Sequence, residues 1–73
     1  MTRIELETGG SVWKILKNRG DKVLEGEVLF ILEVMKMEVS YEAPISGELT
    51  EIYIKEGEAV EEGQVAVEIL NLN

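Results

Sequence analysis

The sequence predicts an all-β fold made of two similar halves, and three observations lead to this prediction. Moving the sequence along itself by 37 residues aligns Ile4–Glu33 with Tyr41–Leu70 without a gap, and eight of the thirty aligned residues are identical. The aligned glycines keep the same spacing in both halves, which chance agreement between two strand-rich segments does not explain. No segment longer than a few residues shows the 3.6-residue apolar spacing of an amphipathic helix.

Each half reads, in order, as a strand, a turn, a short buried link, a second turn and a second strand. In the first half, Gly20-Asp21 follows a strand, where glycine can take the positive φ of a tight turn. Val23 then points inward, and Gly26 turns the chain into the apolar strand 28–32. The second half repeats these positions at Gly57-Glu58, Val60, Gly63 and residues 65–69.

The alternation of side chains along the two long strands predicts which side faces the core. One side carries Val28, Phe30 and Leu32 in the first half, and Val65, Val67 and Ile69 in the second. The other side is predicted to be at least partly exposed to solvent, because it carries Glu68. Its other residues are Leu29, Ile31, Glu33, Ala66 and Leu70. The rest of the predicted core is Ile4, Leu6, Val12, Ile15, Leu49 and Ile52. Trp13 aligns with Thr50, so a half-exposed indole is expected.

The runs Val28–Leu32 and Val39–Glu42 are predicted to be the two strands of a β-hairpin, and the segment that joins the two halves, residues 34–40, holds its tip. The break between its strands contains no Gly, Asn, Asp or Pro, so turn chemistry alone does not specify it, and its register must come from the strands. A lysine at such a tip is usually a solvated charge, and methionines there can pack on the hairpin. Met35-Lys36-Met37 nevertheless places an amine between two apolar thioethers, and apolar groups at a projecting tip favour a partner.

Two halves that are each too small to fold alone are expected to interlock as two antiparallel sheets around one core. The hairpin is then predicted to lie on the pseudo-twofold axis at one end, with the chain termini near the other end. At 73 residues, the chain is predicted to be a single domain over 1–73.

Composition excludes several functional classes. The formal net charge is −8, which disfavours nucleic acids and anionic membranes and favours docking on basic protein surfaces. Without His or Cys, the chain lacks the usual general base, thiolate nucleophile and zinc ligands, so it is predicted to be a substrate of enzymes and not an enzyme. The longest apolar run, Val28–Leu32, is too short to span a membrane, and the absence of Cys fits a cytoplasmic location.

Met35-Lys36-Met37, preceded by Glu33 and an apolar run, resembles the attachment site of biotinyl domains, the biotin carboxyl carrier family. The resemblance extends over nearly the whole chain, through 10–15, Gly20-Asp21-Lys22-Val23, Glu25-Gly26, Ala43-Pro44-Ile45-Ser46-Gly47 and 57–64. It implies a flattened β-barrel, or barrel-sandwich hybrid, of two pseudo-twofold-related halves. The six repeated glycines would be structural turn glycines with no binding role; they are Gly10, Gly20, Gly26, Gly47, Gly57 and Gly63.

The resemblance also implies the function. A biotin protein ligase would join biotin to Lys36 through an amide, and the domain would act as a swinging arm. It would move a carboxyl group between a biotin carboxylase and a carboxyltransferase or decarboxylase. Met35 and Met37 would signal the site to the ligase and help to position the biotin. Ligase recognition would also involve Glu33, Val34 and Glu38.

Two other functions remain open at this point. A lipoyl carrier domain has a similar fold but usually carries Asp before the lysine and a small residue after it, whereas both neighbours of Lys36 are Met. An unmodified barrel-sandwich domain could serve as a docking or spacer module, although a spacer has no need of the Met-Lys-Met tip. Val34 departs from the Ala found at that position in many bacterial biotinyl domains and resembles the Val of eukaryotic-type acetyl-CoA carboxylases.

Overall fold

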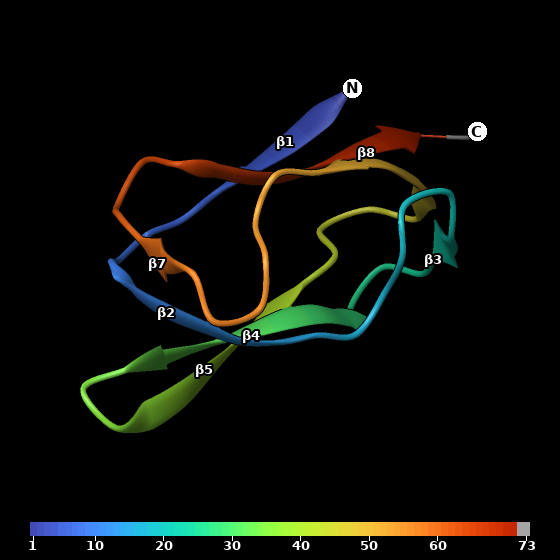
Figure 1. The fold of residues 1–73 in the computed structure, drawn as a ribbon. Helices are drawn as coiled ribbons and strands as arrows, with labels where there is room; N and C mark the ends of the chain where they lie inside the picture. Colours follow the sequence, from blue (N-terminus) through green and yellow to red (C-terminus); the bar gives the residue numbers. More distant parts are fainter. Residues whose placement is uncertain (72–73) are drawn as a thin grey trace.

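The computed structural model describes residues 1–71, which form eight β-strands and no helix (Figure 1). The strands are β1 (Thr2–Glu5), β2 (Gly10–Ile15), β3 (Lys22–Val23), β4 (Val28–Val34), β5 (Met37–Glu42), β6 (Gly47–Ile52), β7 (Ala59–Val60) and β8 (Val65–Asn71). They make two four-stranded antiparallel sheets, with strand orders β1-β8-β6-β3 and β5-β4-β2-β7. The predicted all-β fold of two antiparallel sheets is confirmed.

The two sheets are built alike because each takes two strands from each half of the chain. A shift of 37 residues exchanges β1 with β5, β2 with β6, β3 with β7 and β4 with β8, and so converts one strand order into the other. The cross-strand pairing follows the same rule, since Ile4↔Val67 in one sheet corresponds to Phe30↔Tyr41 in the other. Neither half therefore has a complete sheet of its own, and the halves stabilise each other.

The core repeats the same relationship. Within residues 1–71, twelve of the thirteen buried apolar residues form six pairs that are 37 residues apart: Leu6/Ala43, Val12/Leu49, Val23/Val60, Leu29/Ala66, Phe30/Val67 and Leu32/Ile69. The inward positions predicted for Val23 and Val60 are confirmed, with exposed fractions of 2% and 4%. Trp13 is half-exposed as predicted, at 45%.

The thirteenth core residue, Ile54, has Lys17 as its counterpart in the other half. The ammonium of Lys17 lies 2.6 Å from a carboxylate oxygen of Glu27. This hydrogen bond, together with one from the backbone of Leu24, lowers the pKa of Glu27 from its ordinary value. Lys17 therefore forms a surface ion pair at the position where its counterpart, Ile54, is buried in the core.

One prediction about the long strands was wrong. Strict alternation predicts that Leu29 and Ala66 lie on the solvent-facing side of their strands, but their exposed fractions are 1% and 0%. The register shifts at both positions, between Val28 and Phe30 in one sheet and between the residues that pair with Val65 and Val67 in the other. A bulge adds one residue to the alternation, so two successive side chains face the core. Val28 and Val65 are accordingly only half-buried.

The repeated glycines serve two different purposes. Gly20, Gly26 and their counterparts have φ between 84° and 94°, which confirms them as turn glycines. Gly10 and Gly47 were predicted as turn glycines too, but they begin β2 and β6. A Cβ on Gly10 would lie 2.5 Å from the carbonyl oxygen of Glu33, and one on Gly47 would lie 2.1 Å from that of Leu70. These two glycines permit close approach of neighbouring strands.

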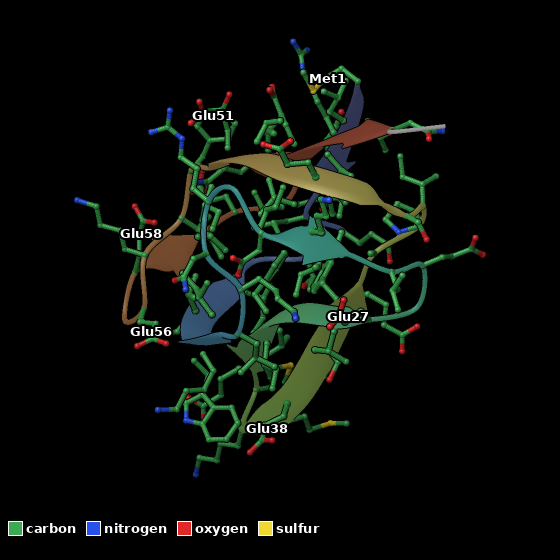
Figure 2. All side chains as sticks on the ribbon, turned by 90° about the vertical axis from the view of Figure 1, so that its right-hand side faces the viewer. Met1, Glu27, Glu38, Glu51, Glu56 and Glu58 are labelled. Carbon is green, nitrogen blue, oxygen red and sulfur yellow. The ribbon has the colours of Figure 1, made fainter. Side chains whose placement is uncertain are left out.

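The hairpin between the halves does not lie on the pseudo-twofold axis, contrary to prediction. The symmetry relates the β4–β5 pair to the β8–β1 pair, so the hairpin corresponds to the place where β8 ends and β1 begins. The hairpin and the described chain ends lie at opposite ends of the molecule, as predicted (Figure 1). Figure 2 likewise shows Glu38 and Met1 at opposite ends.

Candidate functional site

The candidate site is the two-residue turn that joins β4 to β5. Val34 pairs directly with Met37, so Met35 and Lys36 alone connect the strands. Both have positive φ, 52° and 66°, as a type I′ turn requires. Asn and Gly usually fill such turns, so this turn exists because the paired strands impose it. The expectation that the strands set the register is confirmed by six cross-strand pairs between β4 and β5.

The side chains of this turn point into solvent. The exposed fraction is 91% for Met35 and 68% for Met37, and Lys36 is exposed as well. Neither methionine belongs to the core or packs against it. Among residues 1–71, the ammonium of Lys36 makes no hydrogen bond and no ion pair. The hairpin projects beyond the sheets (Figure 1), so a partner protein can surround the amine.

The residues that flank the turn differ in their contacts. Glu33 and Glu38 face each other across the hairpin and are both exposed. Like charges in directly opposite positions are destabilising, so the hairpin keeps this pair at a cost to its own stability. Val34 is half-buried and packs against the core. The structure therefore brings the six predicted site residues together in one hairpin: Glu33, Val34, Met35, Lys36, Met37 and Glu38.

Gly10 supports the base of this hairpin and was not predicted to take part in the site. A Cβ at Gly10 would lie 2.5 Å from the Glu33 carbonyl oxygen and 3.0 Å from Cγ2 of Val34. Any larger residue would therefore displace β4 where it enters the turn. The repeat of Gly10 at Gly47 signals this close approach, although the sequence alone does not tell it from a turn glycine.

The site can present an amine but offers little further chemistry. No group of three or more Asp or Glu side chains within the described part of the chain is arranged to hold a metal ion. The described residues contain no helix that could cross a membrane. A primary amine on a projecting two-residue turn is suited to acylation by another protein, which would have to supply the base and the activated acyl group.

The comparison with protein families identifies the family of this domain. A family model described as "Biotin-requiring enzyme" matches residues 3–69, nearly the whole chain. The chain belongs to the biotin/lipoyl attachment family. This is a carrier-domain family, whose domains are not themselves catalytic.

Three curated relatives show the range of the biotin/lipoyl family. The chain is 38% identical over 68 residues to the biotin/lipoyl attachment protein of Bacillus subtilis, with 93% of each chain covered. It is 42% identical over 60 residues to pyruvate carboxylase of B. subtilis, covering 82% of this chain but 5% of that protein. It is 37% identical over 62 residues to the dihydrolipoyllysine-residue acetyltransferase component of the pyruvate dehydrogenase complex of Mycoplasma capricolum, covering 85% of this chain and 14% of that protein.

The fold of the biotin/lipoyl family agrees with the structure. The lipoyl domain of the 2-oxoglutarate dehydrogenase complex from Azotobacter vinelandii superposes with a TM-score of 0.85 at 22% identity, covering 97% of this chain and 98% of that one. At this identity, the likeness establishes the barrel-sandwich fold alone.

Proposed function

We propose that this domain carries biotin on Lys36 and acts as the carboxyl carrier of a biotin-dependent carboxylase or decarboxylase. The observation that carries the proposal is the unpaired Lys36 amine at the apex of the turn, flanked by two exposed methionines. The relatives include biotin carboxyl carrier proteins and pyruvate carboxylase. The partners would be a biotin protein ligase, a biotin carboxylase and a carboxyltransferase or decarboxylase, all in the cytoplasm.

Attachment would require the amine to lose a proton, because only a neutral amine can attack an activated acyl group. The ionisable neighbours that the hairpin places beside the turn are Glu33 and Glu38, and neither accepts a hydrogen bond from the Lys36 ammonium within residues 1–71. The ligase must therefore provide the base. The role of the two glutamates would be to attract a basic ligase surface, while Val34 anchors the turn.

The biotin ring would supply the carboxyl-carrying chemistry when attached. The domain itself would tether that ring to a docking module, which raises the effective concentration of the ring at each partner active site. A two-residue turn serves this purpose because the paired strands end next to the lysine, so the arm begins at the lysine side chain.

Other lysines are less suited to selective modification. The Nζ of Lys14 lies 5.9 Å from the centroid of the Trp13 ring, and Lys17 is paired with Glu27. Lys22 and Lys55 are exposed, so exposure alone is not the criterion. Lys36 differs from them in its positive φ and in its methionine neighbours, which together give the ligase a shape to recognise.

Lipoate is the second candidate for the group attached to Lys36, because some relatives have names that refer to lipoate. One relative is a dihydrolipoyllysine-residue acetyltransferase, and another is named for both attachments. The two methionines favour biotin, because lipoyl domains usually carry Asp before the lysine and a small residue after it. An unmodified docking module is a third function, against which the exposed methionines argue.

The deciding experiment incubates the protein separately with a biotin ligase and a lipoate ligase and maps the modified residue by peptide mass. Biotin on Lys36 of the wild type supports the proposal. Lys36→Arg should abolish labelling because a guanidinium stays protonated, whereas Lys22→Arg should label normally. The double variant Met35→Asp/Met37→Ala should shift acceptance towards lipoate. Lipoate alone on the wild type, or biotin on another lysine, would overturn the assignment.

A further inference from the structure

A groove runs beside β5, the outermost strand of its sheet, and takes no part in the proposed attachment. Its volume is about 500 Å³, and its lining residues are Glu7, Thr8, Val39, Ser40, Tyr41 and Glu42. One wall is the edge of β5, and the other is the segment that leads from β1 to β2. The Tyr41 ring is stacked on Phe30 with centroids 4.8 Å apart, and its hydroxyl oxygen accepts the N–H of Glu7 at 3.1 Å. The groove is thus held open by fixed side chains.

Within residues 1–71, no strand pairs with the outer edge of β5, so this edge offers unpaired backbone groups to the groove. The two-residue turn makes Val34 and Met37 a hydrogen-bonded pair, and such pairs alternate along an antiparallel hairpin. Val39 and Tyr41 therefore direct their backbone N–H and C=O groups towards β4. Ser40 and Glu42 direct theirs outward, at the position that one more strand of the sheet would occupy.

The pseudo-twofold symmetry provides an internal comparison, because the edge strand β1 is the counterpart of β5. Beside β1, the counterparts of Glu7 and Thr8 are Pro44 and Ile45, and Ile45 packs against the core. Proline has no N–H to donate, and the counterpart of Tyr41 has no hydroxyl to accept one. Glu7, Thr8 and Tyr41 are thus departures from the repeat, whereas Glu42 is repeated as Glu5.

We propose that the groove binds an extended segment of a partner protein, in which apolar residues alternate with lysine or arginine, as a fifth strand beside β5. Pairing with Ser40 and Glu42 would supply the backbone hydrogen bonds. Side chains on the inner face would pack on Val39 and Tyr41, which lie half-buried at the mouth of the sandwich. Basic side chains would meet the carboxylates of Glu7 and Glu42, in a protein whose net charge is −8.

The test uses the Lys36→Arg protein, so that its outcome does not depend on any attached group. The probe is a peptide as long as β5, six residues, that alternates valine and lysine. Backbone amide NMR signals are followed during titration to about 1 mM peptide, where weak strand pairing is measurable. Shifts should concentrate at Glu7, Thr8, Ser40 and Glu42. Methylation of the peptide nitrogens that face β5 should abolish them, since it removes hydrogen-bond donors but no charge.

A matched pair of charge reversals separates groove binding from general attraction. Glu7→Lys/Glu42→Lys should weaken peptide binding about tenfold, because both carboxylates line the groove. Glu25→Lys/Glu62→Lys changes the net charge equally at two exposed turns and should leave binding nearly unchanged. Unchanged thermal unfolding of each variant would exclude loss of the fold as the cause.

Several results would overturn the proposal. Equal weakening by both charge reversals, or equal binding of the methylated peptide, would show adsorption to acidic surface in general. Shifts that map to β1, or no shifts at all, would show that the groove is not a strand-binding edge. Concentration-dependent pairing of β5 with a second copy of the chain, in the absence of peptide, would identify the occupant as the protein itself.

Discussion

Met35 and Lys36 adopt a backbone conformation that favours glycine, and this strain can be removed by substitution. Their φ values are 52° and 66°, in a region that costs an ordinary L-residue roughly 1–2 kcal/mol. The double variant Met35→Asn/Lys36→Gly supplies residues suited to a type I′ turn. Almost no packing is lost, because Met35 is 91% exposed and Lys36 makes no polar contact within residues 1–71.

The expected gain is smaller than the strain itself. Glycine also increases the conformational entropy of the unfolded chain, which costs roughly 0.5–1 kcal/mol, and asparagine relieves only part of the strain. The net increase in the free energy of unfolding should therefore be about 1 kcal/mol. For a domain of this size, that corresponds to a rise of about 4–8 °C in the midpoint of thermal unfolding. Circular dichroism and urea titration measure the two quantities independently.

The matched control is Met35→Ala/Lys36→Ala, which removes the same side chains but keeps a Cβ at both positions. It should give no stabilisation, because alanine suffers the same steric conflict at positive φ. If the Asn-Gly variant were no more stable than the Ala-Ala variant, the turn would not be strained in solution.

The single variant Met35→Asn should be slightly more stable than the wild type but should accept biotin more slowly. This result would separate the effect of the residue on stability from its effect on recognition by the ligase.

Three further outcomes follow from the packing and the charges. Val23→Ala and Val60→Ala should each lower the free energy of unfolding by about 0.5–2 kcal/mol, and unchanged urea midpoints for both would show that neither position is a core position. Glu27→Gln should flatten the acid limb of the stability profile in urea titrations at several pH values. The pKa of Glu27 is lowered from 4.5, so its contribution is complete above that pH and lost as the pH falls through the folded-state pKa; an unaltered acid limb would contradict this. Gly10→Ala and Gly47→Ala should both destabilise the fold, but only Gly10→Ala, beside the hairpin base, should slow the modification of Lys36.

The turns and the inward valines could be predicted because they recur in both halves. Val23 and Val60 are each followed three residues later by a glycine of positive φ, and the same local sequence gave the same local structure twice. The position of Lys36 at a hairpin tip followed from the same repeat, since Lys36 lies in the link between two complete copies. Local preference combined with repetition was sufficient for these features.

The bulges could not be predicted because they break the period on which the prediction depends. Alternation assigns Leu29 and Ala66 to the outer side, and one extra residue in the strand turns them inward. The type I′ turn also has no local signal, since Met35 and Lys36 disfavour it and only the pairing of β4 with β5 imposes it. These features depend on contacts between strands, which a single strand does not encode.

The groove beside β5 was missed for a related reason. It depends on how Glu7 and Thr8 meet the edge of a strand more than thirty residues away, through the bond from Glu7 to Tyr41. Neither residue belongs to a recognisable motif. The sequence does show that Thr8 and Tyr41 differ from their counterparts, Ile45 and Ile4, although not what the difference produces.

Departures from the repeat separate structural residues from residues with another role. A position whose counterpart has the same kind of residue, such as Val23 or Gly20, is accounted for by the fold, because both halves need it. A departure requires a separate explanation. Lys17, opposite a buried isoleucine, is explained by its ion pair with Glu27. Tyr41 and Thr8 make contacts that are not repeated at their counterparts in the other half of the chain. The strained Lys36 makes no polar contact within residues 1–71 that would explain it. Lys36, Thr8 and Tyr41 are therefore the departures from the repeat at which we propose contacts with other proteins.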